Sequence, residues 1–418
     1  MYQIETGERF FKKYKELNNY KGSPRDFLKD ILFPLLYGSN RHLLWVHNNS
    51  FFQQKNKFKK TKTPEEILKL SLEDYFSKLN SKNNTMVCMA GGYVSDMKTG
   101  TTSGQITEHN QFDENNVCYS YIGEALNVGV SGGLSISFFN DEILQIVFEG
   151  IKLYKIFLDE DEKIKDGQLK FWNGLYLYSV LKGCDIQETI INHISETNGR
   201  HLEGVNWLNL FFENAINNYD INTIAVSSLG QTNETYGIIT VDLENINNFK
   251  EFYHRIYDNE FLAKNEKLIY EYLTHNKSLY YFVNLMKIGG KIFYQNDFND
   301  EDIKKKKFNK EIYYKNKKIS AMAELNNSQA FINAEKLSNV LKNYQKEDKG
   351  SLSINVNNVS NFLKSKTKID ALTSLNTIVT HFDDEEKKVV KDYVKFIDSV
   401  DNNKFYYFMS LVNININL

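Results

Sequence analysis

The sequence is poor in proline and cysteine, with 3 residues of each among 418. Scarce proline is typical of a helix-rich chain, because proline interrupts the hydrogen bonds of a helix interior. The cysteines stand far apart, at positions 88, 118 and 184. Their odd number and wide spacing argue against a disulfide framework and favour a reducing, cytoplasmic location.

Long apolar runs and a strong net charge are also missing. No run approaches the roughly 18 apolar residues of a membrane span, so we expect no membrane association. Residues 1–9 lack the basic-then-apolar pattern of a secretion signal. The formal net charge is −2, so a surface that binds nucleic acid has to be a local patch rather than a field over the whole molecule.

Linear catalytic motifs are absent as well. The 8 histidines show no metal-binding HExxH or HxH spacing, and the chain has no Gly-x-Ser-x-Gly turn, kinase signature or dinucleotide fingerprint. We therefore predict no catalytic residue, no bound metal and no cofactor. An enzyme remains an alternative, because carboxylates that meet only in space leave no linear signature.

The sequence does contain a glycine-rich stretch, residues 86–139. Val87–Met89 and Tyr93–Val94 are predicted as short strands around a Gly-Gly turn, and residues 96–116 as a long polar loop. Gly129–Gly133 is similar to a backbone nest for phosphate but lacks the lysine of a phosphate loop. One alternative function is therefore an enzyme with its site at this turn.

Apolar periodicity and capping residues predict the helices. Ser23–Asp26 and Thr63–Glu66 have the features of helix starts, with proline at the first helical position, and Gly183 has those of a helix stop. Two apolar segments, 223–229 and 236–243, are predicted as strands that complete a sheet begun earlier. The other predicted helices include 142–158, 169–182, 246–257, 260–274, 278–288, 319–345, 357–365, 368–381, 383–399 and 403–413.

These elements predict an α+β fold. Residues 1–290 are expected to form a mixed-sheet domain wrapped by helices. Residues 291–318 are predicted as a basic linker and residues 319–418 as a helical bundle domain. A short strand is predicted at Ser351–Val356.

A short polar segment between aromatic residues follows the first predicted helices. Asn48, Asn49 and Ser50 are predicted as a turn there. Side-chain amides pair well with adenine. The candidates for contacts to base edges are therefore Asn48, Asn49, Gln53 and Gln54, and the alternative interpretation is a hairpin or turn beside the core.

Lysines follow directly, with no acidic residue among them. Lysine binds phosphate as a point charge. The candidates for phosphate contacts are Lys55, Lys57, Lys59, Lys60 and Lys62. A second candidate group, Lys304, Lys305, Lys306 and Lys307, lies in the predicted linker. The alternative is that these segments are solvated loops of a lysine-rich chain.

The order of several features resembles the large-subunit family of type I CRISPR effector complexes (Cascade), in its short form. The first is a helix at Phe33–Tyr37 that runs into Asn48–Phe52. The second is the pair of segments around Cys88 and Cys118, followed by a helix that includes Phe148–Tyr154. The third is the all-helical C-terminal third of the chain.

In that family the two cysteine segments are often CxxC knuckles that hold zinc. Here each keeps only its first cysteine, and a pair of cysteines without further ligands does not hold structural zinc. The resemblance is therefore to a form with degenerate knuckles, and we predict no metal. Packing around Val87, Val94, Val117 and Ile122 would have to hold these segments in place.

The resemblance implies a subunit without catalytic chemistry of its own, in which the domain of residues 1–290 serves nucleic-acid and target recognition. Such a subunit lies beside the 5′ end of the CRISPR RNA, recognises the short motif that flanks the target (PAM recognition) in duplex DNA, and helps RNA-guided strand opening. The implied partners are the other subunits of the ribonucleoprotein complex, the target duplex DNA and a separate nuclease-helicase. The alternatives are an enzyme of a defence or mobile-element system with its site at the Gly129–Gly133 turn, or a protein-binding scaffold that uses the aromatic-rich helices.

Overall fold

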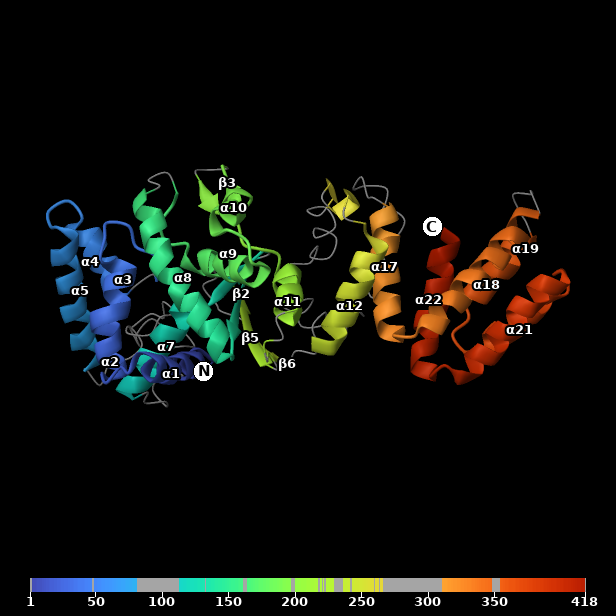
Figure 1. The fold of residues 1–418 in the computed structure, drawn as a ribbon, viewed down its shortest axis with the longest axis horizontal. Coiled ribbons are helices and arrows are strands. Elements are labelled where there is room, and N and C mark those ends of the chain that lie inside the picture. The colour runs from blue at the N-terminus through green and yellow to red at the C-terminus, as the bar shows by residue number, and fades with distance from the viewer. Residues whose placement is uncertain are drawn as a thin grey trace, which may run out of the picture. The chain divides into compact units, whose positions relative to one another are not determined.

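The computed structural model describes residues 2–46, 49–80, 113–131, 133–160, 164–196, 200–216, 219, 221, 223–228, 236–240, 243–258, 260–262, 264–265, 310–347 and 354–417. The chain divides into two compact units, Met1–Val241 and Asp242–Leu418, and Figure 1 labels their elements. This division falls earlier in the sequence than the predicted boundary at residues 291–318, whose N-terminal half lies outside the described residues.

The first helix of unit 1 is α1 (Tyr2–Asn18), and the helix after it starts as predicted. Ser23 caps α2 (Pro24–Phe27), and its side chain accepts a hydrogen bond from the Asp26 amide. The chain then passes through a π-helical segment, η1 (Leu28–Leu32), into α3 (Phe33–Tyr37), which ends at Gly38. Pro34 therefore does not end the helix. Because proline has no N–H to donate, the wider π turn before it is a way to keep the helix going.

Several of the predicted base and phosphate contacts lie on the next helix and in the turn that follows it. Residues Ser50–Phe58 form α4 rather than a loop. The capping box that precedes α5 (Pro64–Leu79) is confirmed, since the Thr63 amide donates to the Glu66 carboxylate at 2.9 Å and the Glu66 amide donates to the Thr63 hydroxyl at 3.3 Å. The lysine-rich segment is therefore split between the end of one helix and a short turn.

The segment around Cys118 is a helix and not a knuckle. Residues Glu114–Ala125 form α7, capped by the Asp113 side chain, and α7 packs along α1 in Figure 1. Residues 114–116 belong to α7, although the sequence predicts them as the end of the polar loop 96–116. Cys118, Val117 and Ile122 are all buried. The predicted strands and cysteine segment between residues 86 and 112 lie outside the described residues.

Aromatic side chains fill the core beneath these helices. The ring of Phe51 lies 4.5 Å from that of Phe33 and stacks on Tyr37 at 4.2 Å. A second cluster joins Phe10 to Phe148, whose ring centroids are 4.9 Å apart. Because these rings are buried, many of the aromatics serve the core.

A four-stranded sheet lies in the same unit, with the strand order β1-β2-β5-β6. Its strands are β1 (Val128–Val130), β2 (Leu134–Phe138), β5 (Thr223–Ser228) and β6 (Tyr236–Thr240). The late strands complete a sheet begun earlier, as predicted. However, all of its ladders are antiparallel, so the predicted mixed sheet is wrong while the α+β class is confirmed.

Further helices and a small hairpin complete unit 1. They are α8 (Asp141–Glu160), α9 (Leu169–Lys182), α10 (Ile186–Ile191), β3 (Ile194–Ser195), β4 (His201–Leu202) and α11 (Trp207–Ile216). Gly183 ends α9 with a φ of +68°, as predicted. The Trp172 indole of α9 donates to the Gly150 carbonyl of α8 at 2.7 Å, which fixes these two helices together.

The described elements of unit 2 are helical. They are α12 (Leu243–Ile256), α17 (Lys310–Leu325), α18 (Ser328–Glu347), α19 (Ile354–Leu363), α20 (Lys368–Val379), α21 (Asp384–Ser399) and α22 (Asn402–Asn417). α17 begins inside the predicted linker. The helix predicted at 319–345 is interrupted near Asn326, whose φ is +41°. Residues 354–356 begin α19 and do not form the predicted strand.

None of the described helices combines the length and apolarity that a membrane crossing requires.

Candidate nucleic-acid interface

Asn49 caps the start of α4, and its buried side chain forms hydrogen bonds within the protein. Its side-chain oxygen accepts from the Phe52 amide at 2.8 Å, and its side-chain nitrogen donates to the Tyr121 hydroxyl at 2.7 Å. The residue is 2% exposed. Both ends of the amide therefore have partners, and the prediction that Asn49 reads a base edge is wrong.

The other amide candidates differ from Asn49. Gln53 is exposed on α4, whereas Gln54 is half-buried beside the carboxylate of Asp74 on α5. Asn48 lies outside the described residues. Among the predicted base contacts that the structure describes, Gln53 is thus the most exposed.

Lys55 holds two distant segments together. Its ammonium group pairs with the Asp166 carboxylate at 3.0 Å, and both side chains are about one-fifth exposed, at 21% and 22%. The same carboxylate accepts from the His42 amide at 3.3 Å. Lys55 is therefore part of a structural ion pair, and less of its charge is available to an added anion than the sequence pattern predicts.

Lys57 and Lys62 flank one aromatic ring. The two ammonium groups lie 4.9 Å and 5.6 Å from the ring centroid of Phe58, which is half-buried at the end of α4. A cation over an aromatic face is attracted by the ring's quadrupole. Phe58 thus keeps two cations close together at the surface despite their mutual repulsion.

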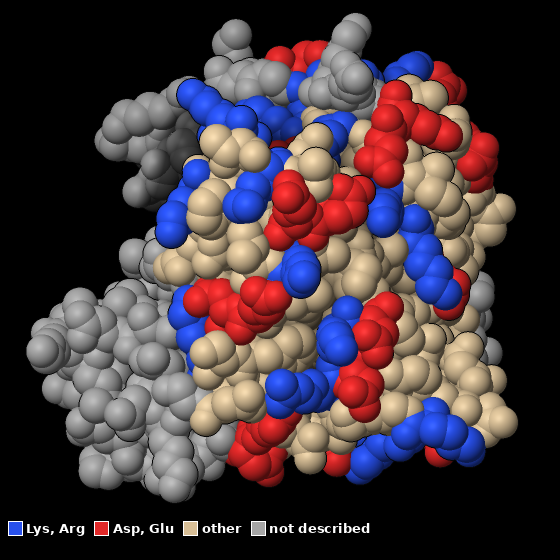
Figure 2. Space-filling view, turned by 90° about the vertical axis from the view of Figure 1, so that its left-hand side faces the viewer, with Lys and Arg blue, Asp and Glu red and all other residues tan. Residues whose placement is uncertain are grey.

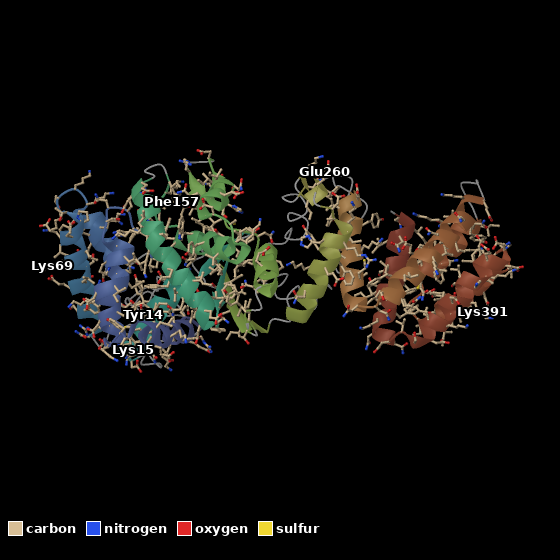
Figure 3. The ribbon with its side chains drawn as sticks, in the orientation of Figure 1. Tyr14, Lys15, Lys69, Phe157, Glu260 and Lys391 are labelled. Atoms are coloured by element: carbon tan, nitrogen blue, oxygen red, sulfur yellow. The ribbon has the colours of Figure 1, made fainter. Side chains whose placement is uncertain are left out.

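Lys59 and Lys60 lie in the turn between α4 and α5 and are both exposed. Among the described residues neither has an ion-pair partner. In Figure 2, Lys and Arg side chains are interspersed with acidic ones over the face shown, including its upper end, where the α4–α5 turn lies in Figure 1. Lower on that face, acidic and basic side chains alternate. Lys69, on α5, is labelled in Figure 3.

A pocket of about 310 Å³ opens beside this turn. Its lining residues are Tyr37, Ser39, Asn40, His42, Lys55, Lys59, Lys60, Pro64 and Ile67. Three of the predicted phosphate-binding lysines are thus brought to one pocket. The structure adds Ser39, Asn40 and His42, for which the sequence offers no local signal, because they come from the segment that follows α3.

The buried side chains that form the floor of the pocket, His42 and Tyr37, are uncharged near neutral pH. Burial, together with the nearby Lys55, lowers the pKa of His42 to about 3, against the opposing effect of Asp166. Burial also raises the pKa of the Tyr37 hydroxyl above its usual value. That hydroxyl lies 2.7 Å from the Tyr121 hydroxyl. Near neutral pH the charge of the pocket therefore comes from its lysines.

The second predicted lysine group, Lys304–Lys307, lies outside the described residues. Later lysines of the same basic segment are helical, on α17. Lys315 pairs with Glu311 at 2.7 Å and lies 4.2 Å from the ring centroid of Phe261. Burial, aided by Arg255 and Lys342, lowers the pKa of Lys318. These two lysines are thus partly engaged within unit 2.

The turn at Gly129–Gly133 has a structural explanation. Gly129 lies on β1, where an added Cβ would meet the Lys170 backbone of α9 at 2.9 Å, and Gly133 has a φ of +75° in the hairpin turn. The glycines thus allow close packing and a tight hairpin. Among the described residues no group of three or more His, Cys, Asp or Glu side chains gathers to hold a metal.

Comparisons with known protein families, with curated proteins and with solved structures find no match.

Proposed function

We propose that this chain is the non-catalytic large subunit of a type I CRISPR interference complex. In this role it binds duplex DNA next to the target, recognises the flanking motif and helps RNA-guided strand opening. Its partners are the RNA–protein subunits of the complex and a separate nuclease-helicase, in the cytoplasm. The proposal combines the sequence resemblance with one observation, the lysines at the end of α4 and in the turn that follows it.

The observation that carries nucleic-acid binding is the arrangement of Lys57, Lys59, Lys60 and Lys62. All four lie within one turn of helix and one loop, with Phe58 between two of them. No acidic residue occurs from position 51 to 62. A compact cationic patch of this kind binds phosphates without regard to sequence, and the exposed Gln53 lies on the same helix.

The test replaces Lys57, Lys59, Lys60 and Lys62 by alanine in the full chain. We expect weaker binding to duplex DNA of any sequence, and a salt slope that is flatter by about one unit for each lysine that contacts a phosphate. The matched control replaces four exposed lysines on α21 of unit 2 by alanine, which removes the same amount of charge. They are Lys387, Lys388, Lys391 and Lys395. Lys391 is labelled in Figure 3.

A flatter slope in the first variant alone would support the proposal. Equal flattening in both variants would mean that only the total charge matters. An unchanged slope in the α4 variant, measured in the assembled complex as well as in the isolated chain, would contradict a DNA contact at this patch.

An apolar groove in unit 2 favours a second candidate function, a protein-binding scaffold. The groove has a volume of about 340 Å³ and lies between α20 and α21, where Ile369 is 76% exposed. Stable association with a protein partner, together with no affinity for DNA or RNA at low salt, would select this function over the first.

A further inference from the structure

The pocket beside the α4–α5 turn has a more specific composition than a surface patch. One wall carries cations, Lys59 and Lys60, and the floor is made by buried side chains of Tyr37, His42 and Ile67. A phosphate on the outside of a double helix needs only an exposed cation. A pocket with a floor fits a ligand that can enter it.

The charge of the pocket exceeds what one phosphodiester supplies. The Asp166 carboxylate offsets Lys55 at 3.0 Å. Lys59 and Lys60 have no ion pair among the described residues, so the wall carries a net charge of about +2. A phosphodiester carries one negative charge, whereas a phosphomonoester carries about −1.5 to −2 near neutral pH. The balance of charge therefore matches a terminal phosphate.

The remaining lining residues match a nucleoside. Pro64 and Ile67 present an apolar side, and Asn40 is an exposed amide with no hydrogen-bond partner among the described residues. An amide of this kind pairs with a base edge. A volume of about 310 Å³ lies at the small end of ligand pockets, which suits one nucleotide and not a length of strand.

We propose that this pocket binds a nucleoside monophosphate group, with its phosphate on Lys59 and Lys60 and its base against Pro64, Ile67 and Asn40. The group is either the phosphorylated end of a nucleic-acid strand or a free mononucleotide. In the strand-end form the inference rests on the proposed nucleic-acid function. In the mononucleotide form it is independent of that function.

The experiment compares one single-stranded oligonucleotide in three forms, with a 5′-phosphate, with a 3′-phosphate and with hydroxyl ends. Binding to the full chain is measured by fluorescence anisotropy. We expect one phosphorylated form to bind about tenfold more tightly, the effect of one additional charged contact. AMP, CMP, GMP and UMP are then tested as competitors against inorganic phosphate at equal concentration.

Two double variants separate the pocket from the patch. Lys59→Ala with Lys60→Ala should abolish the preference for the phosphorylated end. Lys57→Ala with Lys62→Ala removes the same charge outside the pocket, so it should weaken all three forms equally and keep the preference. Melting temperatures of both variants show whether the fold is retained.

The possible outcomes are distinct. If no oligonucleotide binds, the strand-end form of the inference is wrong, while the proposed function is still judged by the salt slope for duplex DNA. If a mononucleotide still binds in that case, the inference stands with the free nucleotide as ligand. If all three forms bind equally and no mononucleotide competes better than inorganic phosphate, the patch binds nucleic acid but the inference about the pocket is wrong.

Discussion

Gly7 on α1 and Gly123 on α7 meet backbone to backbone. A Cβ added to Gly7 would lie 1.9 Å from the Tyr119 carbonyl oxygen, and one added to Gly123 would lie 2.0 Å from the Gln3 carbonyl oxygen. Neither obstacle is a side chain that could rotate away. Any residue with a side chain at either position therefore forces the two helices apart.

We expect Gly7→Ala to lower the free energy of unfolding by about 2–3 kcal/mol, the usual cost of overpacking. Alanine is the better helix former by about 1 kcal/mol, so the loss arises although helix propensity favours the substitution. The control is Gly150→Ala on α8, where the added methyl group would meet the half-buried ring of Tyr176. This ring can move, and a smaller loss is expected. Urea denaturation measures both, and equal losses would contradict a rigid backbone contact.

Asn49 offers a graded test of its two hydrogen bonds. Asn49→Ala removes the helix cap and the donor to Tyr121, and we expect a loss of about 2 kcal/mol in the free energy of unfolding. Asn49→Ser retains an oxygen that can cap α4, so it should cost about half as much. Neither variant should change the salt slope of DNA binding, because Asn49 is buried. A changed slope in a folded Asn49→Ser protein would restore Asn49 as a nucleic-acid contact.

His42 should make the protein sensitive to acid. Its pKa is about 3 in the folded state, whereas an unfolded histidine titrates near 6.5. Between these values the unfolded state binds a proton that the folded state does not, so the stability falls as the pH drops. The expected loss is about 1.4 kcal/mol for each pH unit below about 6.5.

His42→Phe keeps a ring of similar shape without the titrating group. We expect its free energy of unfolding, measured at intervals from pH 7.5 to pH 4.5, to decline less steeply than that of the wild type. Parallel pH profiles for the two proteins would show that His42 is not the group responsible.

Glu124 forms a largely buried ion pair that crosses from α7 to α9. Its carboxylate accepts from Lys170 at 2.7 Å and from the Asn127 side chain at 2.8 Å. We expect Glu124→Gln to lower the free energy of unfolding by about 2–3 kcal/mol, because Lys170 is left without its counter-charge. The double variant Glu124→Gln with Lys170→Met should recover part of this loss. A double variant as unstable as the sum of its single changes would argue against coupling between the two residues.

Features set by neighbouring residues were predictable from the sequence. The caps at Ser23 and Thr63 and the stop at Gly183 each depend on a few adjacent residues, and all three are confirmed. The α+β class followed because apolar periodicity distinguishes the two late strands from the helices around them. Most of the described helices were expected within a few residues of their observed limits.

Features that depend on distant partners were not predictable. Asn49 looked like the tip of a turn, because its pairing with Tyr121 joins residues 72 positions apart. The partner of Lys55, Asp166, is 111 residues away, so the sequence showed a free lysine where the structure has an ion pair. The pocket was missed for the same reason, since Ser39 and Asn40 reach it only after α3 has packed against α4 and α5.

The contact between α1 and α7 also has a consequence during synthesis, because the two helices are far apart in the sequence. α1 ends at Asn18, and α7 is complete only at Ala125. At a translation rate of about 5–20 residues per second, α1 leaves the ribosome roughly 5–20 s before the surface that will cover it exists. Throughout that interval the part of its surface that α7 covers lacks its partner. α1 is thus made well before α7 can cover it, and a nascent chain stalled before α7 would leave that surface of α1 uncovered.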